Sequence, residues 1–464
     1  MDSFMNFVAR VSEFTTVPLM ILLVGGGIFL TIKLGFFQFK YFPHIMKLTF
    51  GSMFKKGDGE GTVTPFQAVS SALASTVGAA NIIGVPVAIA LGGPGAVFWM
   101  WMVAIIGMAT KYSEVVLGLK YRTTNKKGEY IGGPMYYIDR GLGWKKTAIM
   151  FAVIQLLVVF ASTSVQSNSL AGAFSGSFQI PPIVTGIVVS ALIVLVMFGG
   201  LTSIGKFAEK VVPSMVVLYL AASLIVIILH IDAVPNAFYM IFKYAFTPIS
   251  AAGGFAGAAV AAAIRWGIAR GVYSNEAGMG SAAIFHAGAK IKHPASQGFW
   301  GVFEVFVDTI VVCTITAVVI LSTDVWQTVE ASAAAGMTAQ AMASVFGSGP
   351  AGLIITVAVF IFAFTTILMV VYAGEKQAEY LFGYKASIVS RYIFIGAVLF
   401  GSVGSLLLVW SLLDIMLALI VVPNMTALLF LSGKVKDITV DYFTNYYKRS
   451  QSRSRGIGKK NKLI

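Results

Sequence analysis

Long apolar runs separated by short polar loops dominate the chain. A hydrocarbon core about 30 Å thick needs roughly 20 apolar residues per helix, and about eleven runs satisfy that length. The pattern therefore predicts an all-α polytopic membrane protein. The expected spans are 14–34, 65–91, 95–119, 147–171, 182–200, 211–230, 248–272, 297–322, 350–373, 388–409 and 411–433.

Composition supports a membrane location. Of the 464 residues, 57% are hydrophobic and 11% are charged, and the mean hydropathy is +0.85. These values lie outside the range of soluble globular proteins. The first apolar run follows Asp2, Arg10 and Glu13 and continues to spanning length, so we expect a retained helix rather than a cleaved signal.

Basic residues concentrate in alternate loops, which predicts the orientation. Positive residues favour the cytoplasmic side, whereas the opposite loops carry almost none besides Lys243. The bias predicts a plasma-membrane protein with its N-terminus outside and its C-terminus in the cytoplasm. The basic loop residues are Lys33, Lys40, Lys47, Lys55, Lys56, Lys120, Arg122, Lys126, Lys127, Arg140, Lys145, Lys146, Lys206, Lys210, Lys290, Lys292, Lys376, Lys385 and Arg391.

The C-terminal tail, KRSQSRSRGIGKKNKLI, is densely basic and contributes to the net charge of +14. Such a run is compatible with nucleic-acid binding. On a polytopic protein it more often sets topology or contacts anionic lipid. We therefore expect no nucleic-acid partner.

Residues for bond-making chemistry are sparse. His44, His230, His286 and His293 are scattered near span ends, without cysteines or carboxylates at metal-ligand spacing. The single cysteine, Cys313, excludes an intrachain disulfide framework. No P-loop or nucleophile elbow is present. The sequence thus argues against an enzyme and against a bound cofactor.

One membrane-depth stretch, STVGAANIIGVP (Ser75–Pro86), is unusually polar and rich in helix breakers. Gly78 and Gly84 weaken a helix, and Pro86 cannot donate to the carbonyl of Ile82. A broken helix is tolerated in lipid only where protein or a polar cavity covers it. Its freed carbonyls, with Thr76 and Asn81, would suit a cation. Alternatively, the small residues only permit close helix contacts.

A second stretch, Ala251–Ser281, favours the first of these interpretations. It is a glycine- and alanine-rich membrane run that ends in a polar turn. Two interrupted helices at matching positions indicate an inverted-repeat transporter with its site at the bilayer midplane. We therefore divide the chain as follows: 1–64, an extra helix and loop; 65–231, a first five-helix repeat; 232–433, a second, inverted repeat; and 434–464, the basic tail.

Ionisable residues within the predicted spans are costly and mark function or a partner. Glu304 and Asp308 lie four residues apart, on one helix face. Arg265 lies in the second interrupted segment. We expect an ion pair between Arg265 and one of these carboxylates, with a proton or sodium relay as the alternative.

Neutral polar side chains within the spans are further candidates. Thr365 and Thr366 are adjacent in mid-span; either they bond back to their own helix or they complete a sodium shell. One of Gln155, Gln166 and Asn168 is expected to face the cavity. A further candidate is Trp266, which we expect to lie beside Gly267 within the second break and to close over a ligand.

Three blocks of sequence resemble one transporter family. They are GGPGAVFWMWMVAIIG (Gly92–Gly107), GEYIGGPMYYIDRGLGWK (Gly128–Lys145) and RGVYSNEAGMGSAAIFHA (Arg270–Ala287). They are similar to those of the alanine/glycine:cation symporters, also called sodium:alanine symporters, of the amino acid–polyamine–organocation superfamily. The resemblance covers nearly the whole chain. It implies a leucine-transporter-type 5+5 inverted repeat preceded by one extra helix.

The resemblance also implies a site. The wider fold carries V-G-x-x-N at its broken first helix, which Val77, Gly78 and Asn81 match. By that likeness the carbonyls of Ala74 and Val77 would bind sodium with Thr365 and Thr366. The N–H groups of Ala79 and Ala80 would bind the substrate carboxylate. A second sodium near Thr76 and Asn81 is less well supported, because the chain carries Arg265, Glu304 and Asp308 where related transporters have neutral groups.

The function implied is sodium-coupled import of small neutral amino acids, alanine and glycine, by alternating access. We expect substrate contacts from Thr76, Gly78, Ala79, Ala80, Asn81, Gln166, Trp266, Gly267 and Thr366. Sodium is the coupling ion, and the bilayer and the amino acid are the partners of a monomer. Proton coupling is an alternative. An ion channel is a less favoured one, since no charged rings are present.

Overall fold

The described part of the chain forms a helical bundle with one two-stranded hairpin. The structure, a computed structural model, describes residues 2–78, 80–197, 200–249 and 259–448. The long helices are α1 (Asp2–Lys33), α6 (Ala96–Lys120), α8 (Lys145–Phe178), α9 (Pro182–Met197), α10 (Gly200–Leu229), α12 (Val260–Asn275), α18 (Ser348–Phe382), α19 (Tyr384–Val403) and α20 (Leu406–Phe430).

Shorter elements connect or interrupt these helices. They are α2 (Phe37–Lys40), α3 (Phe42–Ser52), α4 (Pro65–Thr76), η1 (Ala80–Gly84), α5 (Val85–Gly92), β1 (Thr123–Thr124), β2 (Tyr130–Ile131), α7 (Pro134–Leu142), η2 (Ile231–Ala233), α11 (Val234–Tyr244), α13 (Ser281–His286), α14 (Pro294–Val305), η3 (Phe306–Cys313), α15 (Thr314–Ser322), α16 (Val325–Thr328), η4 (Ala331–Gly336), α17 (Met337–Phe346), α21 (Ser432–Asp441) and η5 (Tyr442–Tyr446).

The helices agree with a multi-pass membrane protein. Within the described residues, six helices are long and apolar enough to cross a membrane, or up to eight if each of two bent pairs counts as one span. Pro18–Lys33 and Pro182–Met197 are shorter apolar helices. The predicted span 248–272 lies partly outside the described residues. The count of about eleven spans and the 5+5 repeat therefore stay predictions.

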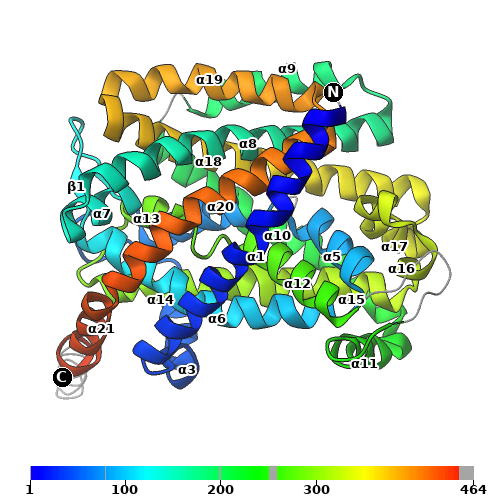
Figure 1. The fold of residues 1–464 in the computed structure, drawn as a ribbon, viewed down its shortest axis with the longest axis horizontal. Helices are drawn as coiled ribbons and strands as arrows, with labels where there is room; N and C mark the ends of the chain where they lie inside the picture. Colours follow the sequence, from blue (N-terminus) through cyan, green and yellow to red (C-terminus); the bar gives the residue numbers. More distant parts are fainter. Residues whose placement is uncertain (1, 79, 198–199, 250–258, 449–464) are drawn as a thin grey trace, which may run out of the picture.

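Two groups of helices can be distinguished in Figure 1: α8, α9, α18 and α19 in its upper part, and α6, α12 and α14 in its lower part. Helix α8 packs against α18, α19 and α20, and α9 packs on α19 at the outer edge. In the second group, α6 packs against α12 and α14. Helix α1 crosses the bundle against α20 and α6. The segment from α4 to α5 contacts both groups, through α18 and α12.

The first interruption follows from its local sequence. Thr64 and Gln67 form a capping box and Pro65 occupies the first turn, so α4 begins firmly. It ends at Thr76, where Val77 turns extended, with φ −76° and ψ 91°. The axis bends by 44° between Pro65–Thr76 and Ala80–Gly92. The predicted break is therefore present.

Pro86 contributes to this break in the way its chemistry dictates. Proline has no N–H to donate to the carbonyl one turn earlier, that of Ile82. In the structure the Ile82 carbonyl accepts a hydrogen bond of 2.7 Å from the Thr338 hydroxyl. A side chain from α17 thus satisfies the carbonyl that the proline frees.

The second interruption is a turn between α12 and α13. Glu276 adopts φ 54°, and Gly278 and Gly280 adopt φ 96° and 84°. Positive φ values of this kind favour glycine and end a helix. Trp266 and Gly267, which we expected within the break, instead lie inside the continuous helix α12. The earlier part of the predicted segment, 250–258, lies outside the described residues.

Candidate functional site

Asn81 holds the first break in shape. Its Oδ1 accepts from the Gly78 N–H at 2.9 Å, an N–H that no helical carbonyl takes up. Its Nδ2 donates to the Asp308 carboxylate at 2.8 Å and to the Ser274 hydroxyl at 3.1 Å. One buried carboxamide therefore ties the break to α12 and η3.

Gly78 packs closely against two polar side chains, Thr366 of α18 and Gln166 of α8. A Cβ placed on Gly78 would lie 2.7 Å from Thr366 Oγ1 and 3.5 Å from Gln166 Nε2. Gln166 is 3% exposed, and its Oε1 has no hydrogen-bond partner among the described residues. Buried amide oxygens are normally paired. The Gln166 amide oxygen is therefore a buried acceptor near the broken helix that no described residue satisfies.

Thr366 links α18 to the broken helix α4. Its hydroxyl lies 3.0 Å from the Ala74 carbonyl and 2.9 Å from that of Phe362. It thus reaches the last turn of α4 from the middle of α18. Two of the predicted cation ligands, Ala74 and Thr366, are therefore in contact.

The other members of the predicted cation set are placed differently. Thr365 bonds back to Ile361 and Phe362 of its own helix and faces Met215 on α10. Thr76 bonds back to Ala72 and Leu73. Val77 is buried at the end of α4. Ala80 is buried at the start of η1, and Ala79 lies outside the described residues.

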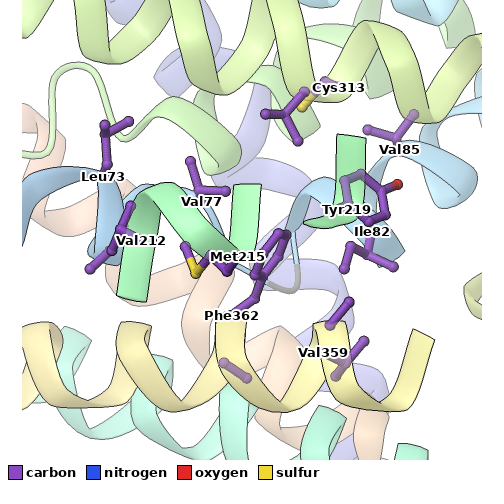
Figure 2. Close-up of a cluster of buried hydrophobic side chains, with 14 of the residues drawn as sticks. Leu73, Val77, Ile82, Val85, Val212, Met215, Tyr219, Cys313, Val359 and Phe362 are labelled. Carbon is purple, nitrogen blue, oxygen red and sulfur yellow. The ribbon is translucent and has the colours of Figure 1, made fainter. Parts of the chain in front are cut away.

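Apolar side chains seal one side of the break (Figure 2). Val77 and Ile82 face Met215 and Tyr219 of α10 and Phe362 of α18 within one buried cluster. Polar groups lie on the remaining sides. The break is therefore covered by protein rather than by lipid, as an interrupted helix in a membrane requires.

Asp308 lies against the break on a second irregular helix. It belongs to the π-helix η3, which contacts the π-helix η1 that carries Asn81. Besides Asn81, its carboxylate accepts from the Ser274 and Thr309 hydroxyls, both at 2.7 Å. All four side chains are buried. Such π-helical turns occur frequently at functional sites.

Glu304 has a partner that the sequence prediction did not name. Lys111 Nζ lies 2.9 Å from Glu304 Oε1, and His286 Nε2 lies 3.3 Å from Glu304 Oε2. Asp308, by contrast, is bonded to the neutral side chains of Asn81, Ser274 and Thr309. Both carboxylates considered as partners of Arg265 thus have other contacts. All three members of the Lys111–Glu304–His286 cluster are buried.

Hydrogen bonds from side chains of α6 stabilise the turn between α12 and α13. Lys111 Nζ donates to the Asn275 carbonyl at 2.8 Å. Glu114 Oε1 accepts from the N–H groups of Gly278 and Gly280 at 3.0 and 2.9 Å. Asn424 of α20 also donates to Glu114 Oε1, at 2.8 Å. Helix α6 therefore determines the shape of the second interruption.

Glu276, in the same turn, connects the two interruptions. The Ser75 hydroxyl lies 3.3 and 3.2 Å from its two carboxylate oxygens, and the Ser281 hydroxyl donates at 2.5 Å. Ser75 belongs to the last turn of α4. A hydrogen bond between buried groups therefore links the end of α4 to the α12–α13 turn.

Trp266 and Gly267 have surroundings that do not include Gly78 among their described neighbours. Trp266 lines a cavity of about 110 Å³ together with residues of α1 and α20, such as Leu19 and Leu417. A Cβ on Gly267 would lie 2.3 Å from the Ala96 carbonyl, so this glycine permits close approach to α6. The contacts of both residues are thus packing contacts between helices.

The structure distinguishes among the three polar side chains of α8. Gln166 faces Gly78. Asn168 donates to the carbonyls of Gly401 and Gly404 at 2.9 and 2.8 Å, fastening α8 to α19. Gln155 is buried, with Oε1 unpaired among the described residues, and no contact joins it to the break.

Sequence reasoning overlooked Ser274, Glu276, Lys111 and Glu114. A signal was available for the last two, because a lysine and a glutamate at i, i+3 within the apolar run 95–119 are costly in lipid and imply buried partners. Ser274 and Glu276 lie in the block RGVYSNEAGMGS. The resemblance of this block to the family did not indicate which of its side chains form contacts with the first break.

Comparisons with known proteins agree with the predicted family. A family model described as the sodium:alanine symporter family matches residues 1–455. The chain is 47% identical over 441 residues to the "uncharacterized transporter YflA" of Bacillus subtilis, covering 94% of this chain and 93% of that protein. It is 42% identical over 440 residues to the "sodium/alanine symporter AgcS" of Methanococcus maripaludis, covering 93% and 96%.

The fold also resembles a solved structure. The crystal structure of MhsT in complex with L-phenylalanine matches with a TM-score of 0.58, covering 82% of this chain and 99% of that one. Sequence identity is 12%. At this identity the match carries information on the fold alone, and it agrees with a leucine-transporter-like arrangement.

Proposed function

Because the chain belongs to the sodium:alanine symporter family, we propose that it imports small neutral amino acids, alanine and glycine, together with sodium. Transport proceeds by alternating access between two inverted five-helix repeats. The N-terminus lies outside, the C-terminus is cytoplasmic, and the monomer is the working unit. This assignment makes the protein a carrier and not an enzyme.

The surroundings of Gly78 carry the proposal. An interrupted helix, a hydroxyl that bridges to it and an unpaired buried amide oxygen meet there. Exposed main-chain dipoles of a broken helix suit a zwitterion and a cation at once. The substrate carboxylate binds the N–H groups at Ala79 and Ala80, and Gln166 contacts the bound amino acid.

The first sodium binds between α4 and α18. The carbonyls of Ala74 and Val77 and the hydroxyl of Thr366 supply oxygen ligands, which suit a hard cation. Thr365 joins this set only after its side chain rotates away from Ile361. The ion thereby fastens the break to α18 and organises the N–H groups for substrate.

A second cation site involves Asn81 and Asp308. The Asp308 carboxylate is buried beside the break, among the hydroxyls of Ser274 and Thr309. A buried carboxylate in this position binds either a second sodium or a proton. This observation keeps proton-coupled symport as the alternative function.

The free energy released when one sodium ion moves down its electrochemical gradient is sufficient to drive uphill uptake of the amino acid. Moving one charge down 100 mV supplies about 2.3 kcal/mol, and a tenfold gradient adds about 1.4 kcal/mol. The sum, roughly 3.7 kcal/mol, supports accumulation of several hundredfold. ATP is not required.

Uptake of labelled alanine into proteoliposomes tests the proposal. Sodium, potassium and proton gradients are imposed separately, with and without a membrane potential. Uphill accumulation driven by sodium alone is expected. Accumulation driven by protons alone would establish the alternative, and rapid ion flux without accumulation would indicate a channel.

A further inference from the structure

Helix α3 has the features of a helix that lies in the membrane interface. It follows α1 and α2 and precedes α4, and it is too short to span the bilayer. It buries Ile45 and Thr49 and exposes Lys47 and Phe50. Helix α3 carries one lysine, and Lys55 and Lys56 follow in the next loop. A short helix that combines apolar residues with nearby lysines is typical of interfacial segments.

A cavity of about 490 Å³ opens beside α3. Lys47 of α3 and Lys55 and Lys56 of the following loop line it. The opposite wall comes from α14 and the C-terminal helices. It includes Trp300, Ser296, Tyr442, Tyr446 and Tyr447. The volume lies within the range of small-molecule sites.

Positive charge in this cavity is not neutralised by the surrounding protein. Within the described residues, Lys47, Lys55 and Lys56 form no ion pair. The carboxylate in the wall, Asp58, is contacted by Lys292 at 3.7 Å and by the Tyr446 hydroxyl at 3.2 Å. The cavity is therefore lined by three lysines that have no carboxylate partner among the described residues and by one carboxylate that already has contacts.

The pKa of His44 is affected by the positive charge of Lys47. Its Nε2 lies 3.1 Å from the Tyr442 hydroxyl, and its ring packs against Phe299, Phe443 and Tyr447. Burial, and next the charge of Lys47, lower the pKa of His44. The imidazole is thus neutral near pH 7, and the lysines carry the positive charge.

Exposed aromatic residues lie on the same segment of chain as the three lysines of the cavity. Phe50 is 59% exposed and Phe54, next to Lys55, is 90% exposed. A phenyl group this exposed on a membrane protein is stabilised by contact with acyl chains. The combination of lysines and phenyl groups matches a lipid, whose phosphate and chains lie close together.

We propose that this cavity binds the phosphate group of an anionic phospholipid. Lys47, Lys55 and Lys56 neutralise the phosphate, and Phe50 and Phe54 contact the acyl chains. The basic tail is excluded as occupant by its own positive charge. A soluble phosphate offers the same anion without the chains, so the two sources are separable by experiment.

The test measures lipid retention by the full-length purified protein, using native mass spectrometry and binding to vesicles. Phosphatidylglycerol is compared with phosphatidylcholine. The triple variant Lys47→Gln, Lys55→Gln, Lys56→Gln is compared with the control triple Lys126→Gln, Lys145→Gln, Lys146→Gln, whose lysines are exposed elsewhere. Loss of roughly a hundredfold in affinity is expected for the first triple alone.

Two further arms separate the sources of phosphate. Phe54→Ser is expected to weaken phosphatidylglycerol binding and to leave binding of inorganic phosphate unchanged. Inorganic phosphate that binds as tightly as the lipid would assign the cavity to a soluble anion. Equal retention of both lipids, or equal losses in the two triple variants, would overturn the proposal.

Discussion

The Thr366 hydroxyl lies 3.0 Å from the carbonyl of Ala74, which joins the middle of α18 to the last turn of the broken helix α4. Its neighbour Thr365 points toward Met215 instead. Of these two adjacent hydroxyls, that of Thr366 contacts the broken helix and that of Thr365 contacts α10. If the first sodium binds between α4 and α18, they differ in function too.

Replacing Thr366 with alanine is expected to raise the sodium concentration for half-maximal uptake by at least about tenfold. A loss of roughly 1.4 kcal/mol in the binding free energy of sodium weakens its affinity tenfold. Contacts to charged groups typically contribute more than this. Thr366→Ser retains the hydroxyl and serves as the rescue. If Thr365→Ala raised this sodium concentration as much or more, the sodium site would have to be assigned to the side of α18 that carries Thr365.

Gly78→Ala is expected to abolish uptake while the protein still inserts and purifies normally. The new Cβ would lie 2.7 Å from Thr366 Oγ1, closer than nonbonded atoms tolerate. Gly84→Ala is the matched control, because its Cβ would meet nothing closer than Ala80 Cβ at 3.9 Å. Uptake by Gly78→Ala at the control rate would remove Gly78 from the site.

Asp308→Asn keeps the size of the side chain and removes its charge. If Asp308 binds a coupling cation, the accumulation ratio of alanine falls to that supported by one ion. Ion flux and amino acid flux measured in the same vesicles give this ratio directly. Asp324→Asn, in an exposed turn, should leave it unchanged, and an unaltered ratio in Asp308→Asn would limit Asp308 to a structural role.

Lys111→Met is expected to destabilise the protein by about 3–5 kcal/mol, because it leaves the buried Glu304 without its cation. The loss is measured as a lower midpoint of thermal unfolding in detergent. Adding Glu304→Gln removes the uncompensated charge and should recover much of that loss. Additive losses in the double variant would mean that the two residues act independently.

Acid should weaken the cap of α14. His293 Nδ1 accepts from the Ala295 N–H at 3.2 Å, which requires an unprotonated nitrogen. Burial lowers the pKa of His293 below its ordinary 6.5, although nearby Asp441 opposes the shift. As pH falls, the unfolded chain therefore takes up the proton first. Stability is full above about pH 6.5 and declines as pH falls through that value.

His293→Asn tests this dependence. Asparagine caps a helix without titrating in this range, so the variant should lose less stability between pH 7.5 and pH 5.5. Part of the slope will persist, because the pKa of His44 is lowered as well. A variant with the full acid sensitivity of the parent would place the effect elsewhere.

The long spans and the first break were predictable because both are local. Apolar length identifies a span, and Gly78 with Pro86 disrupts a helix wherever it is placed. The partner of Glu304 was not predictable, since Lys111 comes from a distant helix whose rotation the sequence does not specify. For the same reason Gln166 was not separable from Asn168, and Thr365 was not separable from Thr366.

The contacts of α6 have a consequence for biosynthesis. Lys111 and Glu114 emerge from the ribosome before their partners on α14 and α20 exist. A lysine at the centre of a lone helix costs about 2.5–3.5 kcal/mol on insertion scales. The third hydrophobic segment must therefore stay sheltered, at the translocon or against its neighbours, until Glu304 and Asn424 arrive. Truncated chains that end before α14 should accordingly be targets for degradation.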